Sequence, residues 1–195
     1  MLKNPLQLRL KKLAPWQEIA FMACLCERMY PNFVAFSKVS DLTDDNIYKD
    51  ILDSIWESLT VKTAKVNFEK QLEKLEEIIP NSDEYTFYGV IPAIDACIAL
   101  STLLHGLLDR DYLTENTEKA SQISVLTVAQ LESIEQEVNI DNENQKDFDV
   151  INDEWDAQWE IFRLLKEPEE RDIELLKGLR SDLRDIGISN LGVAI

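Results

Sequence analysis

His105 is the first residue to test for chemistry, because it is the single histidine of the chain. A helical di-iron site needs a Glu-x-x-His pair on each of two helices, and Thr102 stands three residues before His105. A zinc site would need His105 to converge with Cys24, Cys26 and Cys97, although Cys97 and His105 belong to one predicted helix. We therefore expect no metal and no cofactor. We interpret His105 as a structural histidine near a helix C-terminus, where positive charge is favoured.

Nucleophiles and phosphate-binding loops give no stronger signal. The five glycines are scattered, so the sequence has neither a glycine-rich phosphate loop nor a nucleophile elbow. The three cysteines lie in apolar runs, which is typical of reduced, buried thiols in a cytoplasmic protein. Together these features favour a protein that is not an enzyme.

Asp95 is the most informative single residue, since it lies one turn into the most apolar stretch of the chain. A buried carboxylate must be paired or neutralised. Arg28, Lys62 and Lys65 are candidate partners, and Arg28, Lys65, Asp95 and His105 form a candidate buried polar cluster. We favour a structural ion pair, with Asp95→Ala destabilising the fold by a few kcal/mol. The alternatives are the polar floor of a small-molecule pocket and a carboxylate that meets free N–H groups at the helix start.

Acidic residues concentrate between positions 132 and 160, where eleven acids accompany one base. Asp149, Asp153, Asp156 and Glu160 recur at spacings of four, three and four, so they share one face of a predicted helix. The ordinary interpretation is a solvated face near a helix N-terminus. The functional hypothesis is a docking surface for a basic protein partner, acting as a nucleic-acid mimic. The net charge of −17 disfavours direct binding of the chain to nucleic acid or anionic lipid.

The element that must position Asp95 and His105 is the stretch 89–108, which is apolar on nearly all sides of a helical wheel. Such a helix is either buried in a protein or spans a membrane. An aspartate near the centre of a span costs about 3 kcal/mol, which disfavours the membrane. We therefore predict a buried central helix in a protein with no membrane partner.

Apolar residues at helical spacing predict the other helices. One helix begins at Asn4-Pro5, a second ends before Pro31, and another carries an apolar stripe from Val61 to Ile79. Further helices are expected from the apolar stripes over 47–59, 120–138, 148–162 and 173–183, with a helix start near Thr114 and Gly187 as a C-terminal cap. Positions 41–45 predict a connector, 139–147 an exposed acidic loop, and the apolar tail 188–195 is expected to dock on the domain or on a partner.

The predicted architecture is one all-α domain over residues 1–195, an irregular bundle of seven or eight helices around the central helix. The aromatic stripe Trp155, Trp159 and Phe162 is expected in its core, and exposure of these rings would instead mark a partner contact.

Five segments of the sequence resemble the YjaG-like family of bacterial proteins. They are FMACLCERMYPN at 21–32, ILDSIWESLTVK at 51–62, YGVIPAIDAC at 88–97, EWDAQWEIFRLL at 154–165 and ERDIELLKGLR at 170–180. The resemblance covers almost the whole chain and implies an all-α, cytoplasmic bacterial protein. It implies no activity and no catalytic residues, because the family is a domain of unknown function.

Two functional hypotheses follow. The first is a non-enzymatic cytoplasmic interaction or regulatory protein with an acidic docking surface, and we also consider a homodimer. The alternative is a small-molecule binder or enzyme with a pocket near Asp95 and His105.

Overall fold

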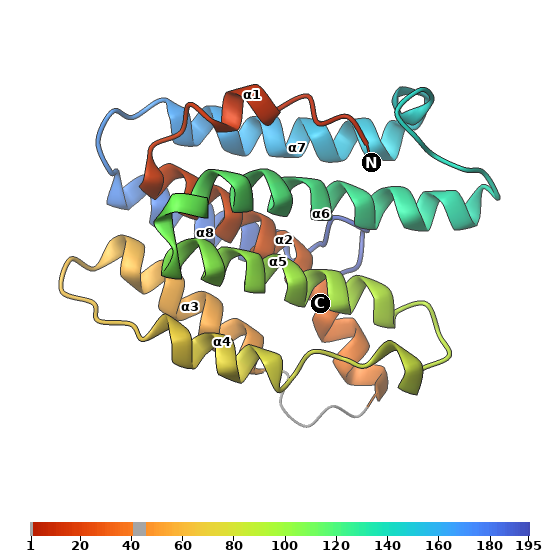
Figure 1. Cartoon of the computed structure of the whole chain (residues 1–195), viewed down its shortest axis with the longest axis horizontal. Helices are drawn as coiled ribbons and strands as arrows, with labels where there is room; N and C mark the ends of the chain where they lie inside the picture. The colour runs from red at the N-terminus through yellow and green to blue at the C-terminus, as the bar shows by residue number, and fades with distance from the viewer. Residues whose placement is uncertain (1, 41–45) are drawn as a thin grey trace.

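The structure is a computed structural model that describes residues 2–40 and 46–195, so the connector expected at 41–45 lies outside the described residues. Within those ranges it contains eight α-helices, three short 3-10 helices and one isolated β-bridge. This confirms the prediction of an all-α bundle (Figure 1). The α-helices are α1 (Gln7–Leu10), α2 (Pro15–Ser40), α3 (Asn46–Thr60), α4 (Phe68–Glu76), α5 (Val90–Leu108), α6 (Leu113–Glu135), α7 (Asp149–Lys166) and α8 (Ile173–Ile186).

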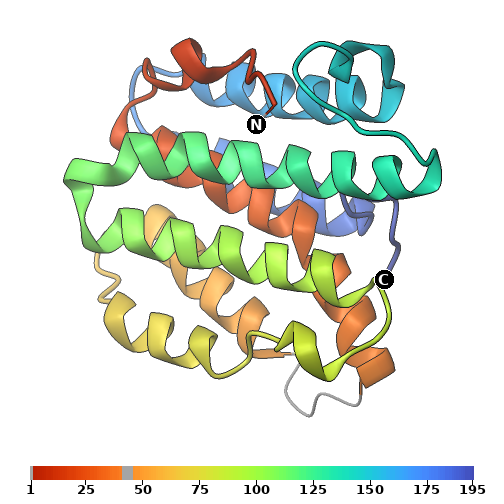
Figure 2. The same ribbon diagram turned by 45° about the vertical axis from the view of Figure 1, so that its right-hand side comes forward.

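The helices lie in layers around α2. Figures 1 and 2 show α1 and α7 on one side of the molecule and α3 and α4 on the opposite side, with α6, α2 and α5 between them. α2 packs against α3, α5, α6, α7 and α8, and most of its residues are buried. The centre is therefore shared by α2 and the predicted central helix α5, which packs against α2, α4 and α6.

The prediction that Pro31 ends the second helix is wrong, because α2 continues to Ser40. A proline inside a helix removes one hydrogen bond and costs about 3 kcal/mol. Here the turns after Pro31 bury Phe33, Val34 and Phe36 in the core. Burial of large apolar side chains, at about 1.5–3 kcal/mol each, outweighs the local cost of the proline.

α5 is buried as predicted along most of its length. Ala93, Ala96, Leu100 and Leu104 are fully buried, whereas Ile98 is 36% exposed on the outer side. The helix is long and apolar enough to cross a membrane, but 67% of its most apolar window is buried inside the fold. The core helix of a soluble protein can be just as long and just as apolar.

The helix expected from Val61 begins later, at Phe68. The side chain of Asn67 accepts a hydrogen bond from the backbone N–H of Lys70, which is the geometry of an N-cap. Residues 61–67 instead form a largely exposed turn and loop. A strong cap therefore sets the start of α4 in spite of apolar spacing further upstream.

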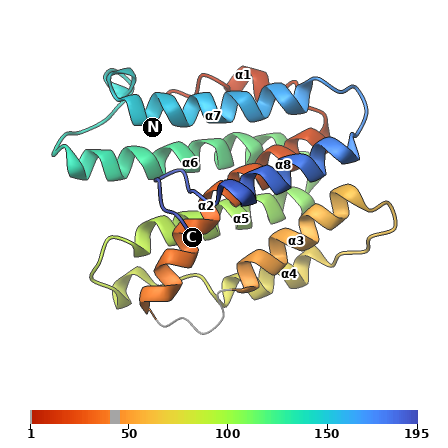
Figure 3. The same cartoon turned by 180° about the vertical axis from the view of Figure 1, so that it is seen from behind.

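The C-terminal segment folds back on the domain. α8 ends at Ile186 and is capped by Gly187, which adopts the predicted left-handed conformation (φ +58°). The tail then docks through Asn190, whose N–H donates to the carbonyl oxygen of Arg28 at 3.1 Å. Figure 3 shows the tail beside α2 and next to α6.

The aromatic stripe of α7 belongs to the core, as expected. Trp155 and Phe162 are buried, and the ring of Trp159 stacks on Phe162 with centroids 5.4 Å apart. The guanidinium of Arg9 lies 4.4 Å from the centre of the Trp159 ring, so the segment around α1 covers this side of α7.

Candidate functional site

The four residues of the predicted buried polar cluster lie in separate places. Arg28 of α2 turns toward α7 and pairs with Glu154, with Nη2 and Oε2 2.6 Å apart. Lys65 is exposed in the loop before α4. His105 is exposed on α5, where its Nδ1 lies 2.8 Å from the carbonyl oxygen of Ser101 on the same helix. The structure therefore does not bring the cluster together.

Asp95 faces α6 rather than a base. Its Oδ2 accepts a hydrogen bond from Thr127 Oγ1 at 2.8 Å, and it forms no ion pair with any residue in the described part of the chain. Burial raises the pKa of Asp95, and the hydrogen bond from Thr127 opposes this rise. The partly buried carboxylate of Asp95 is thus stabilised by a hydrogen bond from a neutral hydroxyl and not by a positive charge.

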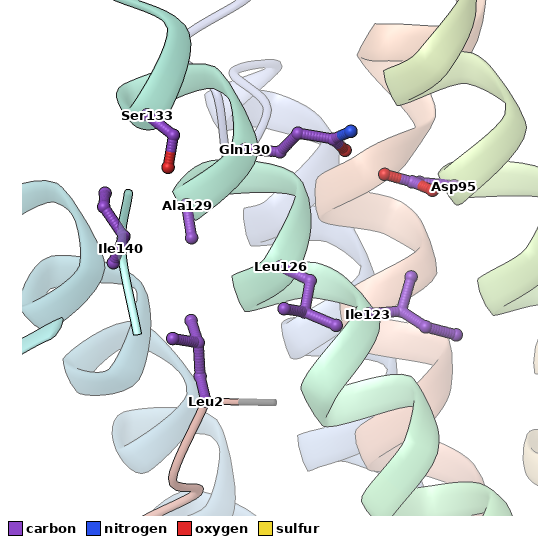
Figure 4. Close-up of a pocket in the computed structure, with 8 residues that line it drawn as sticks. All are labelled: Leu2, Asp95, Ile123, Leu126, Ala129, Gln130, Ser133 and Ile140. Carbon is purple, nitrogen blue, oxygen red and sulfur yellow. The ribbon is translucent and has the colours of Figure 1, made fainter. Parts of the chain in front are cut away.

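A shallow hollow of about 380 Å³ lies over this region of α6 (Figure 4). In Figure 4, Gln130 extends toward Asp95, while Leu2 and Ile140 stand at the opposite end. His105 lines a different hollow of about 390 Å³, together with Ser101, Asp109 and Glu115. Asp95 and His105 therefore line two separate hollows in the described part of the chain, and neither of these hollows contains both residues.

One buried polar network of the fold is centred on Glu154. The side chain of Glu154 is 1% exposed, and its Oε1 accepts hydrogen bonds from Ser124 Oγ at 2.6 Å and from Gln158 Nε2 at 3.0 Å. Asn190 of the tail donates its Nδ2 to the carbonyl oxygen of Ser124 at 3.0 Å. With Arg28, this network ties α2, α6, α7 and the tail together.

Four acidic side chains of α7 are exposed along one face of the helix. Asp149, Asp153, Asp156 and Glu160 all lie at the surface, and Glu160 pairs with Arg163 at 2.6 Å. Within residues 2–40 and 46–195, the other three make no ion pair. We call Asp149, Asp153, Asp156 and Glu160 the acidic face.

The acidic face continues into a groove between α6, α7 and the tail, with a volume of about 350 Å³. Asp153 reaches it from α7, and Glu132 and Glu135 reach it from α6. Leu131 and Leu191 form its apolar wall. We call it the acidic groove. Its carboxylates suit a cationic ligand group, because Arg28, the basic residue that lines it, is already paired with Glu154.

A second groove, of about 310 Å³, shares Leu131 and Leu191 with the acidic groove, so the two adjoin. We call it the apolar groove. It lies between the last turns of α2, the segment before α5, α6 and the tail. Its other lining residues are Asn32, Ala35, Phe36, Val39, Phe87, Tyr88, Gly89, Pro92 and Val193.

The sequence does not predict the apolar groove, because its lining residues come from four segments that are distant along the chain. The available signal was local: Phe87 and Tyr88 immediately precede the central helix, and Asn32 is a polar residue inside an apolar run.

The thiols are not poised for nucleophilic chemistry. Cys24, Cys26 and Cys97 are free and buried, and burial raises the pKa of each thiol well above its ordinary value. They therefore stay protonated near neutral pH. No group of three or more His, Cys, Asp or Glu side chains is placed to hold a metal ion in the described ranges.

Comparison with known proteins places this architecture in a family. The chain is 55% identical over 193 residues to the "Uncharacterized protein YjaG" of Escherichia coli K12 and to that of Salmonella typhimurium, covering 99% of this chain and 98% of each relative. It is 44% identical to an "Uncharacterized protein" of Haemophilus influenzae, covering 98% of both chains.

A solved structure gives the same fold. The crystal structure of a DUF416 family protein from Shewanella baltica matches with a TM-score of 0.91 and 32% identity, covering 99% of this chain and 100% of that one. The model of the family described as "Protein of unknown function (DUF416)" matches residues 5–194. The chain therefore belongs to the DUF416 family and is similar throughout its length to the YjaG proteins that its sequence resembles.

Proposed function

We propose that this chain is a non-enzymatic interaction or regulatory protein of the bacterial cytoplasm, and that its acidic face binds a basic segment of a partner protein. The observation that carries the proposal is the exposure of Asp149, Asp153 and Asp156 without a basic partner among the described residues. Like charges in a row repel each other, and a basic partner relieves that repulsion.

The adjoining acidic groove supports this proposal, since Glu132 and Glu135 extend the same charge from α7 onto α6. Burial, and then the negative charges of Asp95 and Glu135, raise the pKa of Tyr88 to about 12. Glu135 of the acidic groove therefore contributes to this rise, although burial is its largest cause. Each exposed charge pair contributes little, but several together steer a basic partner and select its orientation.

The test uses the full chain and a fluorescein-labelled peptide of alternating lysine and alanine, with binding followed by anisotropy. The variant Asp153→Asn/Asp156→Asn removes two charges from the acidic face. The matched control Glu73→Gln/Glu76→Gln removes two exposed carboxylates from α4. We expect the α7 variant to weaken binding about three- to tenfold and the α4 control to change it much less.

Salt provides the second readout. Binding at the acidic face is expected to weaken between about 50 and 300 mM NaCl, because screening shortens the range of charge attraction. Equal losses in the two variants, or binding that ignores salt, would contradict the proposal. Native mass spectrometry of the protein purified from its host then tests the homodimer that we also consider, since a mass of two chains without another protein would place the interface between copies.

A further inference from the structure

The last helix buries little of its surface. α8 is 14 residues long, and its buried residues are Leu176 and Leu179. α7, the helix before it, buries Ile151, Trp155 and Phe162 among others. In Figure 3, α8 lies in front of α2, and the tail continues from its end. Apolar burial therefore attaches α8 to the fold less firmly than it attaches α7, and such elements can open before the rest of a fold.

Two arginines of α8 make up for this sparse burial. Arg184 Nη2 lies 2.7 Å from Glu27 Oε1 of α2 and 2.5 Å from Asp53 Oδ1 of α3. Arg180 Nη2 lies 2.7 Å from the same oxygen of Asp53. The two arginines therefore connect α8 to both of the helices on which it lies.

Glu27 depends on Arg184 for its charge balance. Its side chain is 2% exposed, and Oε1 accepts hydrogen bonds from Trp56 Nε1 at 2.8 Å and from Arg184 Nε at 2.9 Å. Burial raises the pKa of Glu27, and the hydrogen bonds and charge of Arg184 oppose this rise. Arg184 is the only base that forms an ion pair with Glu27 among the residues that the structure describes. Because a buried carboxylate that loses its base is strongly unfavourable, Glu27 favours the docked position of α8.

The tail is tied to the end of α8 by its own hydrogen bonds. The N–H of Ser189 donates to the carbonyl oxygen of Val193 at 2.8 Å, and the N–H of Ile195 donates to that of Gly187 at 3.2 Å. These bonds close the tail into a loop on the helix end. α8 and the tail are therefore connected as one piece.

The chain before α8 offers a clear pivot. Gln17 Nε2 donates to the carbonyl oxygens of Leu165 at 2.7 Å and of Pro168 at 3.2 Å, which holds the end of α7 on α2. Residues 169–172 follow this anchor, and all four are exposed. A movement of α8 can therefore take place in these four residues without disturbing α7.

We propose that residues 173–195 form a latch, which opens as one unit about residues 169–172 and is held closed by Arg184 in the site made by Glu27 and Asp53. The open latch leaves the remaining helices folded, since α2, α5, α6 and α7 keep their contacts with one another. Opening exposes the buried carboxylate of Glu27 to water, which offsets part of the loss of its base.

The latch also controls the shape of the two grooves. Asn190 and Leu191 of the tail line the acidic groove, and Leu191 and Val193 line the apolar groove. Each groove is therefore complete only while the latch is closed. This device goes beyond the proposed function, because it needs no partner in order to open or close.

The test is hydrogen–deuterium exchange of the full chain, followed by mass spectrometry of its peptides. In the unmodified protein, we expect the amides of α8 to exchange faster than those of α5. Their exchange should also rise less steeply with added urea below the unfolding transition, because opening of the latch exposes less surface than global unfolding.

Arg184→Ala removes the base from Glu27 and should accelerate exchange about tenfold or more in peptides of both α8 and the tail. The matched control is Arg163→Ala, which removes an arginine from an exposed pair with Glu160 of α7. We expect this control to leave exchange in residues 173–195 unchanged.

A double variant distinguishes charge from packing. Glu27→Gln/Arg184→Ala removes the buried charge together with its base, so we expect about threefold or more slower exchange in the latch than in Arg184→Ala alone. Should Arg184→Ala fail to fold, Asp53→Asn weakens the same site while Arg184 keeps Glu27. We expect this variant to accelerate exchange in the latch about threefold.

Four outcomes would overturn the latch. The first is exchange of α8 at the rate and with the urea dependence of α5, which would mean that α8 opens only with the whole fold. The second is exchange in residues 173–195 that neither Arg184→Ala nor Asp53→Asn accelerates. The others are acceleration confined to α8 or to the tail, and a double variant that exchanges as fast as Arg184→Ala. None of these measurements uses the lysine peptide, so the proposed function stands or falls on its own test.

Discussion

Asp95 shows how a single carboxylate can lower stability in a well-packed fold. Its folded-state pKa is raised above the ordinary value by burial, and the opposing contact is a hydrogen bond from neutral Thr127. A raised pKa means that the folded state prefers the protonated acid. The favourable contribution is therefore fully present below the unfolded-state pKa of about 3.9 and is lost as pH rises through the folded-state pKa.

We therefore expect Asp95→Asn to raise the melting temperature at pH 7, because the amide carries no charge and still offers an oxygen to Thr127. The advantage over the unmodified chain should shrink as pH falls and vanish near pH 3, where both side chains are neutral. Thermal melts followed by circular dichroism across this range measure the difference, with Asp182→Asn as an exposed control. A variant that is less stable at pH 7 would show that the charged carboxylate stabilises the fold in spite of its burial.

The sequence predicted Arg28 as a candidate partner of Asp95, whereas the structure pairs Arg28 with Glu154. Glu154 sits between exposed Asp153 and buried Trp155 and was counted with the solvated acids of the region. The spacing of Glu154 indicates that it faces the core, since it lies three residues after Ile151 and four before Gln158, and both of these residues are buried. Helical spacing can place a side chain inward, but it does not reveal which helix faces it.

At the scale of elements, apolar spacing predicted where helices form. The ends of the helices depended on a competition between local signals, such as a proline or a capping residue, and burial of side chains in the core. Pro31 is a strong local stop signal, yet the burial of Phe33 and Phe36 carries α2 past it. At α4 the local signal prevailed, because capping by Asn67 opposes no buried apolar stripe upstream. The end of a helix therefore depends on whether the apolar side chains beyond the local stop or start signal are buried against another helix. The sequence alone does not reveal which side chains are buried in this way.

α8 offers a matched pair of glycines that tests this reading of helix ends. Gly187 has a left-handed conformation (φ +58°) at the C-terminal cap, and its N–H donates to the carbonyl oxygen of Leu183 at 3.3 Å. We expect Gly187→Ala to lower the free energy of unfolding by about 1 kcal/mol, because a Cβ is strained in that conformation.

Gly178 lies inside α8, where an added Cβ meets no atom within 4 Å. We therefore expect Gly178→Ala to raise the free energy of unfolding by about 0.5–1 kcal/mol through helix propensity alone. Urea denaturation of the two variants measures both effects. Opposite signs support the assigned cap, and two changes of the same sign would argue against it.

At the scale of the whole molecule, the fold class was accessible from sequence and the grooves were not. Periodicity along each segment specifies which helices form, and one long apolar helix indicates a buried centre. The apolar groove needs the end of α2, residues 87–89, α6 and the tail to meet, and this depends on how the helices are arranged in space. The concentration of acids over positions 132–160 was visible in the sequence, but only the fold shows that Glu132, Glu135 and Asp153 line one groove between α6 and α7.

That concentration of charge gives a prediction for the molecule as a whole. With a net charge of −17, the folded chain repels itself, and added salt screens the repulsion. We expect the urea midpoint to rise between about 0.02 and 0.5 M NaCl. The Asp153→Asn/Asp156→Asn variant should be more stable than the unmodified chain at low salt and should gain less from salt.

The Glu73→Gln/Glu76→Gln control separates local from global repulsion. It changes the net charge by the same amount, but α4 also carries Lys70 and Lys74, whose attraction to nearby acids is lost with the carboxylates. We therefore expect little or no stabilisation from this variant at low salt. Two outcomes would show that the acidic face is not the main site of repulsion: a larger increase in stability from the α4 variant than from the α7 variant, or a urea midpoint that falls as salt is added. Either outcome would weaken the proposal that the acidic face serves a basic partner.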